Sequence, residues 1–348
     1  MTKFTCHRCL LYTILALLHC VGQCAMAQDA HEEKPRFVYD IDNVNFFDNR
    51  EVHSPYQVSQ TLFASRLDAE IGIQFDANSI MVGIMAVKDF GQSGTAKQEL
   101  NFYYHYEERN FSGAFGAFPR KRLKQELPNI FVYDSIRYYS PTIYGALIQY
   151  TTNFGYAEFY CNWLNKQGKG QREIFELITD GRFGHKGYYF GWNIQLTHFS
   201  VPRPSNGLHV YDKLMIYPHI GIERSPSNMI DAISLEAGCL LSLNRDRSDM
   251  LWHSPIGFLG EVKLRKGRFE VCDYLYAGNP QFTHYEVHGA SLHRGDPYYR
   301  SPLYNRTDVR FYLLNRQNVQ CYAGASLHYT EGTLDNSQQV VLRVFPKF

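Results

Sequence analysis

Apolar and polar residues alternate along most of this chain, in segments of about ten residues that turn residues separate. In TLFASRLDAEIGIQF (61–75), every second residue from Phe63 to Phe75 is apolar or small, while Arg66, Asp68 and Glu70 lie between them. GYYFGWNIQLTHF (187–199) and LMIYPHIGIE (214–223) alternate in the same way. Because successive side chains of a strand point to opposite faces, the pattern predicts strands with one apolar face. Helical periodicity is almost absent.

Counting these segments from RFVYDIDNVNFF (36–47) predicts sixteen strands, an even number that leaves both ends of the sheet on the same side. Fourteen strands are the alternative if 111–118 and 268–277 do not pair. The predicted strands are 36–46, 60–75, 80–89, 98–108, 111–118, 142–151, 156–164, 171–180, 187–199, 213–223, 230–243, 255–264, 268–277, 304–314, 319–329 and 338–348.

The connections between these strands alternate in length. Short turns such as 76–79, 109–110 and 152–155 are followed by long connections such as 89–97 and 119–141. Alternating short turns and long loops are typical of transmembrane β-barrels. In lipid, a sheet must close on itself because every backbone N–H and C=O needs a partner. We therefore predict an all-β fold, a closed antiparallel barrel, with DGRFGHKG (180–187) as one of its short turns.

The first 27 residues differ from the rest of the chain. Lys3 and Arg8 precede an apolar run from Cys9 to about Val21, and Ala25-Met26-Ala27 provides small residues for cleavage. The run is shorter than the ~20 residues of a spanning helix. We predict a secretory signal peptide at 1–27 and a single barrel domain at 28–348.

Composition narrows the class of partners. With 35 Lys and Arg against 34 Asp and Glu, the chain is close to neutral, which argues against nucleic acid as a partner. The 26 Tyr and 24 Phe suit aromatic girdles at two membrane interfaces and require no cofactor. Cys161, Cys239 and Cys321 share the apolar faces of their segments, so we expect small apolar side chains there and no disulfide.

The chain ends in QQVVLRVFPKF, which alternates up to the terminal Phe348. This ending resembles the C-terminal signature of Gram-negative outer-membrane β-barrels, in which the barrel-assembly machinery recognises a terminal aromatic residue. FFDNRE, GAFGAFPR and IRYYSP are similar to segments of poorly characterised outer-membrane barrels of a Bacteroidota-type group. The resemblance to porin-like barrels implies location in the cell outer membrane, with lipid and lipopolysaccharide as surroundings.

In such a barrel, charged residues between the apolar positions point into the lumen. Mixed charge across a lumen selects polar solutes, whereas paired charge fills a narrow barrel. The predicted pore-lining residues are Arg66, Asp68, Glu70, Glu158, His219, Glu223, Glu236, Glu261, Lys263, Asp308, Arg310 and His328. The connection 119–141 either constricts the mouth or contacts lipopolysaccharide phosphate, through Arg120, Lys121, Arg122, Lys124 and Arg137.

Three sets of residues raise the question of enzyme or metal chemistry. His198-Phe199-Ser200 has the His-x-Ser spacing that outer-membrane phospholipases carry on their outer wall, but the sequence offers no third member on a neighbouring strand. An acidic site from loop residues such as Asp134, Asp273 and His288 is a further possibility. His284, His288 and His293 lie near Glu286 and Asp296, but we expect no metal there, because loop histidines seldom bind one without supporting partners.

The sequence therefore predicts a porin-like channel for the passive passage of small polar solutes, with no catalytic residues, metal or cofactor. The first alternative is a barrel enzyme that acts on lipid or peptide at the outer face. The second is a plugged barrel that serves adhesion or binds a partner. A homo-oligomer is possible, since porins of this size often associate through one wall.

Overall fold

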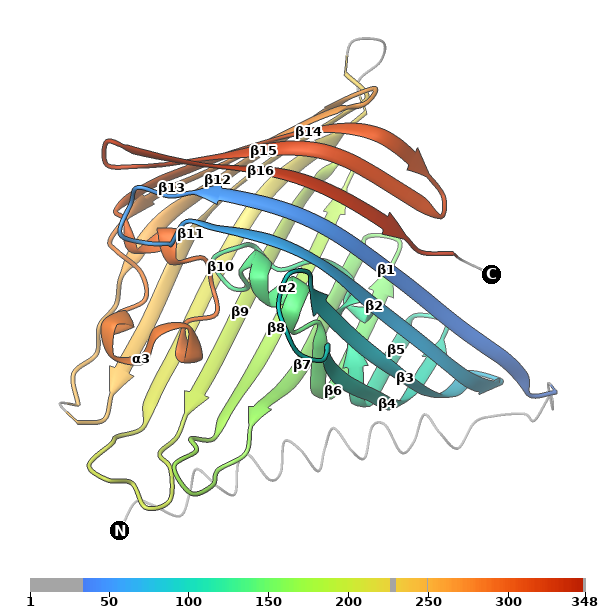
Figure 1. Ribbon diagram of the computed structural model, residues 1–348, viewed down its shortest axis with the longest axis horizontal. Coiled ribbons are helices and arrows are strands. Elements are labelled where there is room, and N and C mark those ends of the chain that lie inside the picture. The colour runs from blue at the N-terminus through green and yellow to red at the C-terminus, as the bar shows by residue number, and fades with distance from the viewer. Residues whose placement is uncertain (1–33, 226–229, 249, 347–348) are drawn as a thin grey trace.

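The strands of this protein form one closed antiparallel sheet. The computed structural model describes residues 34–225, 230–248 and 250–346. Each strand pairs with its neighbours in the sequence, and the first strand also pairs with the last, from Asn43 opposite Val344 to Glu51 opposite Asn336 (Figure 1). The predicted closed barrel of sixteen strands is confirmed.

The elements are β1 (Arg36–Glu51), β2 (Gln60–Phe75), β3 (Asn78–Asp89), β4 (Lys97–Glu108), β5 (Phe111–Pro119), η1 (Arg120–Arg122), α2 (Asp134–Tyr139), β6 (Thr142–Thr152), β7 (Gly155–Asn165), β8 (Ile174–His185), β9 (Tyr188–Phe199), β10 (Tyr211–Arg224), β11 (Ala232–Asp246), β12 (Ile256–Lys266), β13 (Phe269–Gly278), α3 (Tyr285–Leu292), η2 (Pro297–Arg300), β14 (Leu303–Arg316), β15 (Val319–Thr330) and β16 (Thr333–Val344). No helix in this described part of the chain is long and apolar enough to cross a membrane.

Three strands differ from the predicted bounds by about five residues at one end. β1 continues to Glu51 rather than residue 46, and β16 begins at Thr333 rather than 338. β16 starts early because Glu331 and Gly332, with φ of 33° and 89°, make a tight turn after β15. β8 continues to His185, so the turn predicted at 180–187 is confined to Lys186 and Gly187. Phe348 and the predicted signal peptide lie outside the described residues.

The outer face of the sheet is predominantly apolar. Phe102, Phe115 and Ile220 expose 65%, 70% and 66% of their surface, which in water would oppose folding. A continuous apolar band around a barrel is the surface that a lipid bilayer requires. Cys161, Cys239 and Cys321 lie on the outward parity of β7, β11 and β15, as free thiols.

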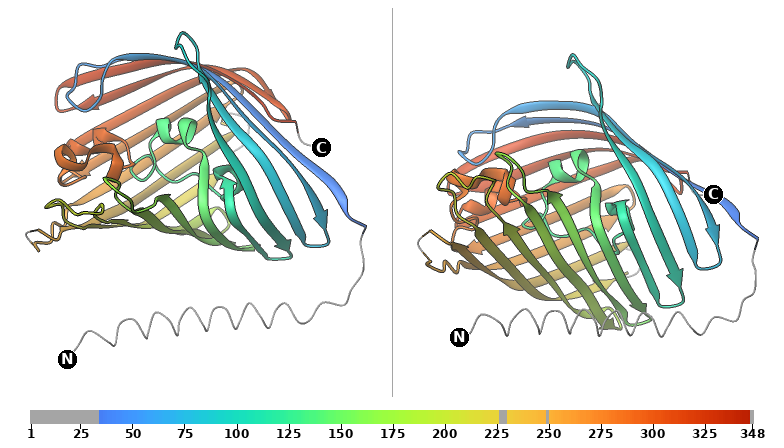
Figure 2. Two further views of the ribbon diagram at one scale, coloured as in Figure 1. Left: turned by 60° about the horizontal axis from the view of Figure 1, so that its bottom comes forward. Right: turned by 90° about the horizontal axis from the view of Figure 1, so that it is seen from below.

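The interior of the barrel is filled by two long connections. Residues 119–141, with α2, lie inside the ring of strands, as Figure 2 shows. Ile130 and Phe131 of this connection are fully buried in a core that includes Tyr103 and Tyr276 of the wall. The second connection, 279–302, is bonded to the first, since Tyr133 N–H donates to the Arg294 carbonyl at 2.8 Å. The barrel is therefore packed at this level.

Candidate functional site

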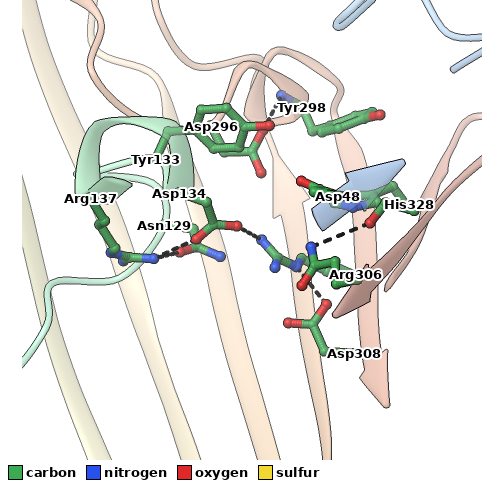
Figure 3. A network of polar contacts seen from close by, with 12 residues as sticks. Asp48, Asn129, Tyr133, Asp134, Arg137, Asp296, Tyr298, Arg306, Asp308 and His328 are labelled. Atoms are coloured by element: carbon green, nitrogen blue, oxygen red, sulfur yellow. Dashed lines mark hydrogen bonds and ion pairs between the residues drawn. The ribbon is translucent and has the colours of Figure 1, made fainter. Parts of the chain in front are cut away.

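An ion-pair network attaches α2 to the inner wall (Figure 3). Arg306 of β14 lies between two carboxylates: its Nη1 is 2.9 Å from Asp134 of α2, and its Nε is 2.8 Å from Asp308. Arg137 also donates to Asp134, at 2.7 Å. Although burial alone raises a carboxyl pKa, Arg306 and Arg137 hold the pKa of Asp134 well below its usual range. Both carboxylates are thus neutralised within the chain.

Most of the predicted pore-lining residues surround one cavity of about 800 Å³. It lies between the inward connection 119–141 and the end of the barrel that carries the short turns, because its lining includes residues next to those turns, such as Arg182 and Arg343. Eight of the twelve predicted residues line it: Arg66, Asp68, His219, Glu236, Glu261, Lys263, Asp308 and Arg310.

The other four predicted residues lie elsewhere. Glu70 and Glu158 point inward against the connection 119–141: Arg122 Nη2 lies 3.8 Å from Glu70, and the Lys124 backbone N–H donates to Glu158 at 3.1 Å. Glu223 pairs with Arg182 at 2.6 Å near a short turn. His328 is hydrogen-bonded to the hydroxyl of Tyr304 at 2.8 Å.

The basic residues of 119–141 face the interior. Lys121 is 2.9 Å from Asp40, and Arg122 donates to the Tyr103 hydroxyl at 2.8 Å. Arg120, Lys124 and Arg137 line the cavity. These side chains therefore lie inside the barrel, and whether they constrict passage stays a prediction.

The loop histidines pack around an aromatic ring. The centroids of His284, His288 and His293 lie 5.8, 5.0 and 6.2 Å from that of Tyr211. Among the residues that the structure describes, no group of three or more His, Cys, Asp or Glu is placed to hold a metal ion. Asp134 lies in the interior network and Asp273 on β13, so the structure does not join them with His288 into an acidic site.

A histidine and an aspartate meet on the outer wall, at the end of the barrel that carries the long loops. His198 of β9 and Asp212 of β10 are direct partners in the sheet register, and His198 Nδ1 lies 2.9 Å from Asp212 Oδ1. Because a carboxylate only accepts, Nδ1 carries the proton and Nε2 is left as the basic nitrogen. His198 shares the outward parity of Ile194 and Leu196, and Asp212 that of Leu214.

Ser200 directly follows β9, two residues after His198. Its backbone N–H donates to the Glu173 carbonyl at 2.9 Å, so the pairing of β8 and β9 extends one residue beyond Phe199. The chain is therefore extended through Ser200, and its side chain projects from the same face as His198, two residues earlier. Serine, histidine and aspartate on one face form the set used for acyl transfer, in which the acid orients the imidazole.

Two kinds of neighbour flank the His198–Asp212 pair. Arg247 Nε donates to Asp212 Oδ2 at 2.8 Å, so both carboxylate oxygens have a partner. On the other side, the Phe175 ring centroid lies 5.1 Å from that of His198, and Trp163 stacks on Phe175 at 5.4 Å. This outward aromatic row on β7 and β8 is a surface on which an acyl chain can lie.

The sequence alone offers no third member beside His198 and Ser200, and the structure brings Asp212 to His198 as a candidate. The strand was predicted to start at residue 213, which placed Asp212 in a loop, whereas β10 begins at Tyr211. Leu214 and Ile216 face outward, and side chains alternate along a strand. Asp212, two residues before Leu214, therefore faces outward if the strand extends that far. The direct opposition of positions 198 and 212 required the register of the β9–β10 hairpin.

Solved structures share this fold. The anion-selective porin from Comamonas acidovorans has a TM-score of 0.55 at 10% identity, with 90% of this chain and 100% of that chain covered. OpdK from Pseudomonas aeruginosa has a TM-score of 0.53 at 8% identity, covering 89% and 98%. OprB from Pseudomonas putida has the same TM-score at 8% identity, covering 90% and 94%. At these identities the likeness concerns the fold alone. No curated protein sequence matches the chain.

The closed sheet and its apolar outer band are those of an outer-membrane β-barrel, and this protein is one. The model of the lipid A 3'-O-deacylase-type family matches residues 29–204, half of the chain, and the chain belongs to this family. The matched region includes His198 and Ser200, and Asp212 follows it closely.

Proposed function

We propose that this protein is an outer-membrane hydrolase that removes an ester-linked acyl chain from lipid A, at the 3'-O position after which its family is described. The observation that carries the proposal is the hydrogen bond of 2.9 Å between His198 and Asp212, beside Ser200, on a wall that faces lipid. Ionisable side chains on a lipid-facing surface are costly and need a functional reason.

The geometry supports the following steps. Ser200 Oγ attacks the ester carbonyl carbon while His198 Nε2 takes the hydroxyl proton. The imidazolium, which Asp212 stabilises, then gives this proton to the leaving sugar oxygen, and an acyl-serine remains. A water molecule, deprotonated by His198, cleaves the acyl-serine to release a fatty acid and regenerate Ser200. The aromatic row at Phe175 offers the acyl chain a place beside the reacting carbonyl.

Acyl release from lipid A tests the proposal. The purified protein is inserted into vesicles that contain lipid A, and the released fatty acid is measured by mass spectrometry. We expect release by the wild type, loss of release by Ser200→Ala, and unchanged release by Ser205→Ala, an exposed serine of the same loop. A wild-type protein without activity, or an active Ser200→Ala variant, would contradict it.

A porin-like channel for small polar solutes is the second candidate. The charged cavity of about 800 Å³ favours it, as does the number of strands, since sixteen-stranded barrels commonly enclose an aqueous channel. The buried connection around Ile130 and Phe131 opposes it, because this segment fills the lumen. Single-channel conductance in a planar bilayer separates the two: discrete steps by Ser200→Ala protein support a channel, and silent insertion rejects it.

A further inference from the structure

We infer that the outer wall formed by β13, β14, β15, β16, β1 and β2 binds a second copy of this chain within the membrane. This inference is independent of the proposed hydrolysis. Its basis is a set of polar side chains that face outward from this wall, which we call the amide wall: Asn43, Asn45, Asn49, Ser65, Asp273, Asn305, Thr307, Asn336 and Gln338.

The parity of each strand places these side chains outside the barrel. Asn43 and Asn45 share the parity of Ile41 and Phe47, which are 36% and 38% exposed, whereas Val44 between them is buried. Likewise Asp273 follows the parity of Leu275 on β13, and Gln338 that of Val340 on β16. Ser65 and Asp273 thus lie between two apolar residues of the outward face, and each of the other polar residues has one apolar neighbour on that face of its strand.

The remaining walls differ. Along the described strands β3–β12, outward positions away from the strand ends carry apolar or small side chains, such as Leu100 and Phe102 on β4. The exception is Thr179 on β8, whose hydroxyl accepts a hydrogen bond from Trp192 Nε1 at 3.3 Å. The polar character is therefore a property of one wall.

Side chains of the amide wall bond to one another along the surface. Asn45 donates to Asn43 Oδ1 at 2.6 Å, and Asn43 donates to Ser65 Oγ at 3.3 Å. Asn49 donates to Gln338 Oε1 at 2.8 Å across the β1–β16 seam. An amide has two N–H donors and two acceptor sites, so these bonds use part of its capacity. In hydrocarbon the rest is satisfied only by another polar surface.

Two features identify that surface as a second copy. Amides donate and accept equally, so a twofold axis can place the wall against itself with every donor facing an acceptor. The one carboxylate, Asp273, is already bonded by Asn305 at 3.0 Å and Thr307 at 2.6 Å, so the wall selects no oppositely charged partner. β15, between these groups, presents Ala323 and Ala325 outward, and such small side chains allow close approach.

The position of the amide wall leaves the His198–Asp212 pair accessible. In the closed strand order, seven strands lie between β1 and β9 in either direction. Figure 1 shows β14–β16 and β1–β2 on one side of the barrel, with β7–β10 on the other. A dimer formed through the amide wall therefore keeps His198 and Asp212 against lipid.

The mass of the purified full chain in mild detergent tests the inference. We expect two copies for the wild type, one for Asn43→Leu/Asn45→Leu, and two for Thr179→Val, the matched control on the opposite wall. Folding of each variant is checked by the resistance of its barrel to unheated SDS. Should the double variant fail to fold, Gln338→Leu decides instead, with a shift toward one copy expected.

Crosslinking in intact outer membranes gives a second readout. In a chain whose native cysteines are replaced by serine, Ala325→Cys is expected to form a dimer with a short bis-maleimide, and Ala157→Cys on β7 is not. A wild type that is a single copy in both experiments would overturn the inference. So would a folded Asn43→Leu/Asn45→Leu variant that stays dimeric, or a complex that contains a different protein.

Discussion

The lumen and the outer rim of β9 and β10 both carry charged side chains, but in very different numbers and with different consequences. Inside, charges such as Arg306, Asp134 and Asp308 neutralise one another and hold the connection 119–141 against the wall. On the outer rim of β9 and β10, the His198–Asp212 pair lies on the outward face, two residues from Ser200. Charge inside the barrel is explained by packing, whereas the pair on the outer rim holds nothing in place, and the proposed hydrolysis gives it a chemical role.

Removing the proposed base has the largest expected effect. His198→Ala leaves Ser200 without a proton acceptor, so acyl release from lipid A is expected to fall by more than about 10⁴-fold. The control is His209→Ala, in the loop between β9 and β10, which is expected to keep the wild-type rate. If His198→Ala kept its activity, His198 would not be the catalytic base. The charged residues of the outer rim would then have only a structural role, as those of the interior do.

Asp212→Asn tests whether the carboxylate beside His198 contributes to catalysis. The amide keeps the shape of the side chain but cannot stabilise the imidazolium, so we expect a loss of about 10⁴-fold in kcat. The control is Glu223→Gln at the far end of the same strand, which is expected to leave kcat unchanged. Equal rates for both variants would contradict a role for Asp212.

A change in the interior is expected to affect stability and not catalysis. Arg306→Met leaves Asp134 and the buried Asp308 without their shared partner, which costs ~3–5 kcal/mol in the free energy of unfolding. Urea unfolding in lipid vesicles measures it, with Lys186→Met in the exposed β8–β9 turn as control. If the folded Arg306→Met variant lost acyl release while Lys186→Met kept it, the interior network would also contribute to catalysis. That result would contradict a purely structural role for the network.

Arg247→Gln has the smallest expected effect. Arg247 bonds to Asp212, but its side chain is 49% exposed, and an exposed ion pair contributes ~0.2–1 kcal/mol. We expect kcat to fall by at most about fivefold, with KM unchanged, because the pair positions Asp212. Added salt is expected to bring the wild-type rate toward that of the variant. A loss as large as that of Asp212→Asn would instead make Arg247 part of the catalytic set.

The strand pattern was predictable because lipid outside and polar groups inside impose strict alternation. The predicted strands were least accurate at β1, β8 and β16, each about five residues short at one end. β8 was short at its end next to a short turn, and β1 and β16 were short at their ends on the side of the long loops. At these ends Asn49, Asn336 and Gln338 face outward, so both faces are polar and the alternation disappears.

The site was predictable only in part. His198 and Ser200 are close in sequence, and their spacing marks one face of a strand. Asp212 depends on the register of a hairpin with an eleven-residue loop, which local sequence does not fix. The inward direction of 119–141 depends on long-range ion pairs such as Arg306–Asp134, between residues far apart in the chain.

The most direct measurement of the central claim is covalent labelling of the nucleophile. A fluorophosphonate that carries a lipid tail is incubated with the protein in vesicles, and the modified peptide is identified by mass spectrometry. The account predicts one adduct, on Ser200, whose formation is lost in His198→Ala and strongly slowed in Asp212→Asn. Absence of an adduct from the folded wild type, or an adduct on another residue that His198→Ala leaves unchanged, would contradict it.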